Sequence, residues 1–321
     1  MLNRLFMHPG RSGFCRILAL LTLLVANTAH SQSRSISTAY GEVTVNGQPE
    51  RIVTLYEGAL DAAIAMGASP VGAVVTRGGN STADYIRPRA GAAQIVGTPG
   101  EFNLEAIIGL TPDIILAPSH LNKDQYQLLS RIAPTIVPHV PAFTADTWKQ
   151  ETRLYAAALG RVREGEAAIT RVEDKIRDMA QLLDSTLSPE QRGASLVRWM
   201  PQGPLMMNTG LFSATLLEAV GFRMDDAGIV KAGRPHSHPL SLENLHLIDQ
   251  HWLFLATLNA DGKEALAAAR TSPAFERLQA SRENRVITVD GQLWTSASGP
   301  IAAEAILDQL RAAVSAGQVQ P

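Results

Sequence analysis

The chain alternates short apolar runs with amphipathic stretches from about residue 40 onward. In the first half, the apolar runs lie at residues 51–55, 70–75, 94–97, 113–117 and 134–137. After Pro189 the alternation returns with runs at 195–199, 205–208, 252–256 and 285–289, and a last helix is predicted from Pro300 to about Val314. Strands separated by helical patterns predict βαβ crossovers. We therefore predict an α/β protein of two lobes, each with a largely parallel sheet flanked by helices.

A long helix is predicted between the two halves. Residues 147–187 are almost free of proline, and apolar side chains recur there at spacings of three and four, at Ile169, Val172, Ile176, Met179 and Leu183. A continuous helix over residues 162–185 would be about 35 Å long, which is enough to link two lobes. Gly160 and Gly165 leave open a helical hairpin packed on one lobe. The predicted boundaries are an N-terminal lobe at 40–161, a linking helix at 162–185 and a C-terminal lobe at 190–316.

A similar phrase occurs in both halves, as Asn-Leu-Glu-Ala-Ile-Ile from Asn103 and as Ser-Leu-Glu-Asn-Leu from Ser241. In each copy, a residue that can cap a helix precedes a glutamate in the first turn, where the helix dipole favours negative charge. An apolar run follows each copy. The repeat predicts two similar half-molecules, each presenting one carboxylate to a partner, from Glu105 and from Glu243.

The first thirty residues have a different character. Arg4, Arg11 and Arg16 precede an apolar run from Ile17 to Val25, and small residues follow it. Because this run is short for a membrane anchor, we predict a cleaved signal peptide over residues 1–31, with an uncleaved anchor as the alternative. The only cysteine, Cys15, lies before the apolar run, so it is not placed to be the lipid-modified cysteine of a lipoprotein.

Composition narrows the classes of function. Without residues 1–31 the chain has no cysteine, which excludes disulfides and thiolate sites. The charge balance then moves from 28 basic against 30 acidic residues to 25 against 30, a net charge of −5, which argues against a nucleic-acid partner. No Gly-x-Ser-x-Gly elbow or Walker-type glycine loop occurs, so we expect a protein that is not an enzyme; a secreted hydrolase is the alternative.

The order of motifs identifies a family. The motif residues are 49–53, 61–67, 70–72, 96–97, 103–105, 111–113, 157–161, 241–245, 298–300 and 307–308, with Trp294. Together they resemble the periplasmic substrate-binding proteins of ABC importers for iron-siderophore complexes, haem and cobalamin, over nearly the whole predicted mature chain. The resemblance implies a clamp with little hinge freedom, a ligand cleft between the lobes and a periplasmic location. It also implies docking on a dimeric membrane permease through Glu105 and Glu243. The expected ligand is a ferric siderophore, with no cofactor.

Arginines and aromatic residues near predicted strand ends are the candidate ligand contacts. Ligands of parallel sheets gather outside the carboxyl ends of the strands, and these side chains suit flat, anionic chelates. Each has a plainer alternative, as a solvated charge or a core residue. The candidates are Tyr56, Arg77, Tyr85, Arg87, Arg198, Trp199, Arg234, His236 and Trp294. Their arginines favour a catecholate or carboxylate siderophore.

Other ligands remain open at this point. A haem receptor would use Tyr56, Tyr85 or His236 as an iron ligand, and a cobalamin receptor would share the fold. A zinc or manganese receptor would use His236 and His238. Because the other histidines show no ligand spacing, we expect no metal site in the protein. We also expect a monomer.

Overall fold

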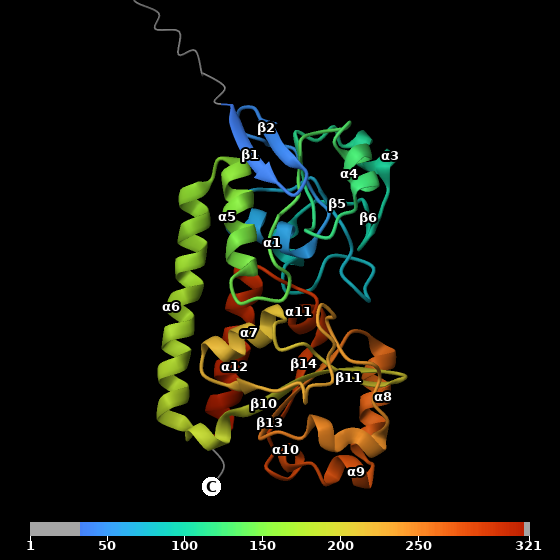
Figure 1. Cartoon of the computed structure of the whole chain (residues 1–321), viewed down its shortest axis with the longest axis vertical. Coiled ribbons are helices and arrows are strands. Elements are labelled where there is room, and N and C mark those ends of the chain that lie inside the picture. Colours follow the sequence, from blue (N-terminus) through green and yellow to red (C-terminus); the bar gives the residue numbers. More distant parts are fainter. Residues whose placement is uncertain (1–32, 318–321) are drawn as a thin grey trace, which may run out of the picture. The chain divides into compact units, whose positions relative to one another are not determined.

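Two α/β lobes make up the part of the chain that the computed structural model describes, residues 33–317. The chain divides into residues 1–31 and a compact unit of residues 32–321, so the predicted signal peptide lies outside the described residues. Within the compact unit, each lobe is built around one five-stranded sheet (Figure 1). The predicted fold class is confirmed. The lobe boundaries given above stay a prediction.

The N-terminal lobe has a fully parallel sheet in the order β5-β4-β3-β8-β9. Its strands are short, and all except the exposed edge strand β5 are buried, as expected where helices cover both faces. They are β3 (Ile52–Thr54), β4 (Gly72–Ala73), β5 (Gln94–Ile95), β8 (Ile114–Leu116) and β9 (Thr135–Ile136). The helices are α1 (Glu57–Ala65), α2 (Arg87–Ala90), α3 (Leu104–Gly109), α4 (Lys123–Leu129) and α5 (Thr147–Leu159).

Two antiparallel hairpins of this lobe are absent from the sequence-based prediction. Both are short and partly exposed, so they lack a run of buried residues that would mark them. They pair β1 (Arg34–Thr38) with β2 (Gly41–Val45), and β6 (Gly97–Thr98) with β7 (Glu101–Phe102). The first hairpin begins at Arg34, before residue 40, the predicted start of the lobe.

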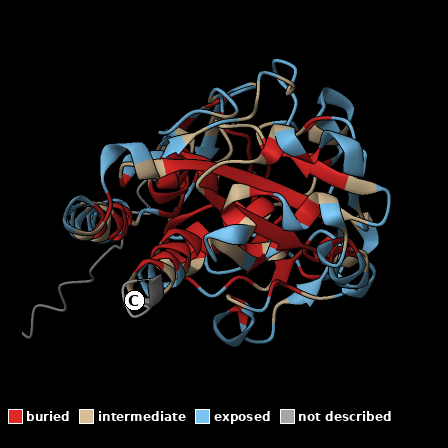
Figure 2. Ribbon diagram, turned by 90° about the horizontal axis from the view of Figure 1, so that it is seen from below, coloured by how far each residue is buried: buried red, intermediate tan, exposed pale blue. Residues whose placement is uncertain are grey.

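The C-terminal lobe has a mixed sheet in the order β11-β10-β13-β14, with β12 also paired to β10. Only β11 is antiparallel to its neighbour. The strands are β10 (Gly193–Met200), β11 (Gly203–Met206), β12 (Arg223–Met224), β13 (Trp252–Thr257) and β14 (Val286–Asp290). The helices are the 3-10 helices η1 (Pro189–Arg192) and η2 (Leu242–Ile248), with α7 (Phe212–Ala219), α8 (Ala260–Arg270), α9 (Pro273–Glu276), α10 (Gln279–Arg282), α11 (Gly291–Thr295) and α12 (Pro300–Gly317). Buried strands form the centre of this lobe (Figure 2).

The linking helix is continuous. Helix α6 (Val162–Thr186) runs beside both lobes (Figure 1). The chain does turn back between α5 and α6, as in the hairpin alternative, at Gly160, which takes a left-handed conformation with φ 69°. Gly165 lies inside α6 without breaking it. A Cβ atom there would lie 2.6 Å from the Cβ of Ala156, so glycine allows α5 and α6 to pack closely. None of the helices between residues 33 and 317 is long and apolar enough to span a bilayer.

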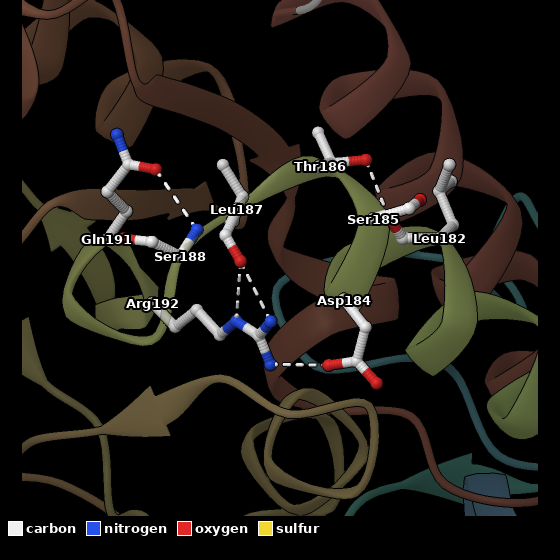
Figure 3. A network of polar contacts seen from close by, with 8 residues as sticks. All are labelled: Leu182, Asp184, Ser185, Thr186, Leu187, Ser188, Gln191 and Arg192. Carbon is white, nitrogen blue, oxygen red and sulfur yellow. Dashed lines mark hydrogen bonds and ion pairs between the residues drawn. The ribbon is translucent and has the colours of Figure 1, made fainter.

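The end of α6 is fixed by side chains that bond to its last turn and to the following loop (Figure 3). Arg192 donates to the carbonyl oxygen of Leu187 at 2.8 Å and pairs with Asp184 at 2.7 Å. Ser188 and Gln191 form a capping box that starts η1. These contacts set the direction in which the chain leaves α6 and enters β10.

The repeated phrase folds differently in its two copies. Asn103 caps α3, because its side-chain oxygen accepts from the N–H of Ala106 at 3.0 Å, as expected. Ser241 makes no side-chain cap bond, and the helix that follows is the 3-10 helix η2. In this tighter turn the N–H of Asn244 bonds to the backbone carbonyl of Ser241 at 3.0 Å. The expected side-chain cap in the second copy is therefore wrong.

Candidate ligand cavity

A cavity of about 320 Å³ lies between the two lobes, and we call it the interlobe cavity. Three neighbouring parallel strands of the N-terminal lobe bring residues to it, since Tyr56 follows β3, Arg77 follows β4 and His120 follows β8. This is the edge where ligands of parallel sheets bind. The remaining lining comes from the β9–α5 loop and α5, and from residues 210–212, 235 and 295–298 of the C-terminal lobe.

The two lobes touch beside this cavity. The indole of Trp148 on α5 meets the ring of Phe212 on α7 edge to face, with centroids 6.3 Å apart and planes at 77°. At Gly210, a Cβ atom would lie 2.1 Å from the carbonyl oxygen of Phe143, so only glycine allows the two loops this approach. Phe143, Trp148 and Phe212 therefore give the interlobe cavity an aromatic side.

A recess of about 90 Å³ adjoins the interlobe cavity and shares Tyr56, Arg77 and His120 with it. A third cavity, of about 560 Å³, lies elsewhere and is lined mainly by α8, by the end of β14 and by residues 257 and 258. It is larger, but almost all its lining comes from one lobe and it contains no aromatic side chain. The interlobe cavity is therefore the better candidate for a ligand site.

Of the predicted ligand contacts, Tyr56 and Arg77 line the interlobe cavity. Arg198 is only 7% exposed and lies behind its wall. Its guanidinium donates to the side-chain oxygen of Thr295 at 2.8 Å and to the carbonyl oxygen of the same residue at 2.6 Å. Burial, helped by the charge of Arg77, lowers the pKa of Arg198 to about 10, so it stays charged at neutral pH. Arg198 thus holds Thr295, which does line the cavity.

The two predicted tryptophans point away from the cavity into the core. Trp199 follows Arg198 on β10, and successive side chains of a strand face opposite sides. It packs against Phe275, with centroids 6.0 Å apart. Trp294 stacks on Phe254 at 5.2 Å. Both indoles are at most 2% exposed, and neither is among the residues that line the cavity.

Three further candidates lie outside the lining. Arg87 is exposed and donates to the carbonyl oxygen of Thr82 at 3.1 Å. Arg234 is exposed in a loop. The ring of His236 bonds through Nδ1 to the carbonyl oxygen of Ser237 at 2.7 Å. None of these three side chains is part of the lining of the interlobe cavity.

Tyr85 takes part in a buried contact between the lobes. Its hydroxyl donates to Asp61 on α1 at 3.1 Å, and the same carboxyl accepts from the N–H groups of Ile301 and Ala302, each at 2.8 Å, at the start of α12. Asp61 is fully buried, and desolvation outweighs these three donors, so the pKa of Asp61 rises to about 7. A Cβ atom at Gly299 would lie 2.6 Å from its oxygen. Asp61 therefore ties residues 295–298, the cavity wall before α12, to the N-terminal lobe.

Glu151 is the main cavity residue that sequence reasoning missed. It lies on α5, lines the interlobe cavity and is 4% exposed. Among residues 33–317 no group hydrogen-bonds to its carboxyl, and burial raises the pKa of Glu151 to about 8. A signal was present in the sequence, because Glu151 falls on the apolar stripe of this helix, with Trp148 and Tyr155.

Glu57 is a second carboxyl at the cavity. Its Oε1 accepts from the hydroxyl of Thr76 at 2.6 Å and from the N–H of Arg77 at 3.1 Å. Within residues 33–317, its Oε2 is buried without a partner, as is the hydroxyl oxygen of Ser296, and both residues line the adjoining recess. Burial raises the pKa of Glu57. At His120, burial and the charge of Arg77 lower the pKa, so that ring is neutral at pH 7.

The comparison with known proteins decides the family. Residues 52–293 match the family model described as periplasmic binding protein. The chain belongs to the periplasmic binding protein family. It is 27% identical over 315 residues to the probable siderophore-binding lipoprotein YfiY of Bacillus subtilis (strain 168), over 92% of this chain and 95% of that protein. It is 28% identical over 300 residues to the Fe(3+)-citrate-binding protein YfmC of the same strain, over 88% and 90% of the two chains.

A solved structure agrees with this assignment. SirA of Staphylococcus aureus, complexed with staphyloferrin B, superposes on this periplasmic binding protein with a TM-score of 0.77 and 27% identity, over 88% of this chain and 98% of that chain. The expected resemblance to this family is confirmed. Between residues 33 and 317, this periplasmic binding protein has no group of three or more His, Cys, Asp or Glu side chains arranged to hold a metal ion.

The two predicted docking glutamates of this periplasmic binding protein are both exposed. Glu105 lies in the first turn of α3, where Ile108, one turn later, is 54% exposed. Glu243 lies in η2 next to Leu242, which is 44% exposed. A surface hollow of about 280 Å³ borders Glu243 and is lined by η2, α9 and neighbouring residues, with Arg277 among them. Each lobe thus presents a carboxylate beside an exposed aliphatic side chain.

Proposed function

We propose that this periplasmic binding protein captures a ferric siderophore in the interlobe cavity and delivers it to the permease of an ABC importer. One observation carries the proposal: the cavity lies between two lobes, at the carboxyl ends of parallel strands, and combines Arg77 and Tyr56 with the aromatic side chain of Trp148. The family and the names of the related proteins support it. Binding and docking are its whole function, without bond chemistry and without a cofactor.

Most of the side chains that would bind haem, zinc or manganese make other contacts or lie outside the cavity. For haem, Tyr85 is committed to Asp61 and His236 lies outside the cavity lining, which leaves Tyr56 as the only candidate iron ligand among those considered. Zinc or manganese would need His236 and His238 to meet further ligands, and residues 33–317 offer no such cluster. A ferric siderophore brings its own iron ligands, so it needs only charge, hydrogen bonds and aromatic surface from the protein.

Tryptophan fluorescence tests the proposed ligand. Of the four tryptophans in the chain, Trp148 lines the cavity, so a bound ferric chelate should quench it. We expect saturable quenching by at least one ferric siderophore and loss of most of that quenching in Trp148→Phe. Trp199→Phe, in the core, is the matched control and should keep it. Binding of haem with a sharpened Soret band, and of no ferric siderophore, would replace this function by haem capture.

We further propose that Glu105 and Glu243 dock on the permease. Ala substitutions at both positions should abolish uptake of the radioactive ferric ligand by cells while leaving its dissociation constant within about twofold, since both carboxylates are exposed and outside the cavity lining. Arg77→Ala should do the reverse and weaken binding itself. A double variant that binds poorly but transports normally would show that we have interchanged the docking face and the ligand face.

The cellular setting follows from the same proposal. We propose export by a signal peptide over residues 1–31 and a monomer in the periplasm. The related YfiY is named as a lipoprotein, whereas the only cysteine here, Cys15, precedes the apolar run. The lobes are linked by α6 and also by the contact of Asp61 with α12, so we expect modest closure on binding. A large ligand-dependent change in radius of gyration by solution scattering would contradict this.

A further inference from the structure

The interlobe cavity and its recess contain hydrogen-bond acceptors that have no donor. Both carboxyl oxygens of Glu151 lack a partner within residues 33–317, and so does Oε2 of Glu57. On the donor side, Arg77 is the only Arg or Lys among the described residues that line the two cavities. His120 is neutral there at pH 7. A ligand that brings hydrogen-bond donors of its own would satisfy these carboxyl oxygens.

The charge of the lining points the same way. Glu57 and Glu151 place two carboxyls in a lining that has one arginine, so ionisation of both leaves a formal charge of −1. In the empty cavity at neutral pH, burial holds Glu151 in its protonated form. A ligand that carries only oxyanions, such as a ferric tris-catecholate, does not complement such a surface. A buried carboxyl without a partner destabilises the fold, and such groups persist mainly where a function requires them. Of the four arginines that favour a catecholate by sequence, Arg77 belongs to this lining, and Arg87, Arg198 and Arg234 lie outside it.

We propose that the siderophore captured here carries a protonated amine, which Glu151 receives, while Arg77 meets oxygen atoms of the iron-chelating groups. An ammonium group has three donors, so it satisfies a carboxylate that has none, and a charge-assisted bond in a buried site is the strong kind. The inference rests on the proposed function and adds the chemical class of the ligand.

Capture of an ammonium group requires that Glu151 ionise, which makes the reaction dependent on pH. Burial keeps the carboxyl protonated in the empty cavity at neutral pH, so binding releases a proton. Burial raises the pKa of Tyr56 and of Tyr155 well above the ordinary value, and the charge of Glu151 adds to both shifts, so both hydroxyls stay neutral at neutral pH. The other titratable or charged groups around the cavity and on α1 are Glu57, Asp61, Arg77 and His120.

Matched ferric chelates test the inference. Ferrioxamine B has a free amine, its N-acetyl derivative has the same iron centre without that charge, and ferric citrate has no amine. Dissociation constants are measured by quenching of Trp148 for the unchanged protein, for Glu151→Gln, and for Glu218→Gln as a control that removes an exposed glutamate outside the cavity. Each series is run between pH 6 and pH 7.5.

We expect the unchanged protein to bind ferrioxamine B at least about tenfold more tightly than its N-acetyl derivative, with an affinity that rises by up to about tenfold per pH unit. Glu151→Gln should reduce the preference to about twofold or less, and Glu218→Gln should keep it. Equal binding of the two forms, a preference that survives in Glu151→Gln, or binding of ferric citrate alone would overturn the inference. Failure of every ferric chelate to bind would instead reject the proposed function.

Discussion

Replacing Glu151 by Gln should stabilise the protein at neutral pH. The carboxyl is 4% exposed and has no hydrogen-bond partner among the described residues, so the amide replaces it without breaking a contact. What the substitution removes is an ionisable group whose pKa rises from about 4.3 in an unfolded chain to about 8 in the fold. Glutamine has the same shape and does not titrate. The expected gain therefore depends on pH.

The magnitude follows from linkage. Because the folded state holds its proton up to pH 8 while the unfolded state releases it near pH 4, stability falls as pH rises between these values. At pH 7 the difference of about 2.7 pH units corresponds to about 4 kcal/mol at 1.36 kcal/mol per unit. Relaxation of the cavity around the charge reduces this value, so we expect Glu151→Gln to gain about 2 to 4 kcal/mol at pH 7. Near pH 4.5 the same arithmetic leaves a gain of only about 0.5 kcal/mol.

Urea titrations at pH 4.5, 6, 7 and 8, followed by fluorescence, measure this difference. Asp61 has a pKa of about 7 and changes stability in the same direction, but it is present in both proteins and cancels. Glu264→Gln is the control, since its side chain is exposed on α8 and its removal should shift the free energy of unfolding by less than about 0.5 kcal/mol. A gain for Glu151→Gln that is equal at pH 4.5 and pH 8, or no gain at all, would refute the reasoning.

Three other substitutions probe the scaffold around the cavity. Asp61→Asn leaves one N–H of α12 facing an amide donor. We expect the free energy of unfolding in urea to fall by about 2 to 4 kcal/mol and ligand binding to weaken. Unchanged affinity would show that other contacts hold the cavity wall. Arg198→Lys loses one of the two bonds to the Thr295 wall and should weaken binding several-fold by fluorescence titration with little change in melting temperature. Gly165→Ala forces α5 and α6 apart, and calorimetry should show a lower melting temperature despite the better helix propensity of alanine.

The fold was largely readable from the sequence because its strands and helices are buried in regular patterns. The apolar stripe of α6 is regular over its whole length, and its predicted extent differs from the observed Val162–Thr186 by one residue. The β1–β2 hairpin and the short helices α9 and α10 leave no such pattern, since they are short and depend on tertiary contacts. The 3-10 form of η2 depends on a backbone bond to Ser241 that residue types do not encode.

The cavity was less readable, because its composition depends on which side of a strand or helix each residue faces. Arg198 and Trp199 are neighbours in sequence but lie on opposite faces of β10, and an alternating pattern alone does not say which face meets the cavity. Tyr56 and Arg77 were found because each comes within a few residues of the end of a parallel strand. Glu151 was missed because acidic residues were not expected in a site for an anionic ligand.

Asp61 and Glu151 show how partners separate a structural carboxyl from a functional one. Both are buried, and burial raises the pKa of each to near or above neutrality. Asp61 accepts hydrogen bonds from three donors that belong to both lobes, so the cost of burying its carboxyl is offset within the protein. These bonds hold the cavity wall in place. Glu151 accepts from none within residues 33–317 and faces the space where the ligand would bind. The cost of burying the Glu151 carboxyl must therefore be offset by a group outside the chain. An amine on the bound chelate is the group whose positive charge and hydrogen-bond donors match this carboxyl.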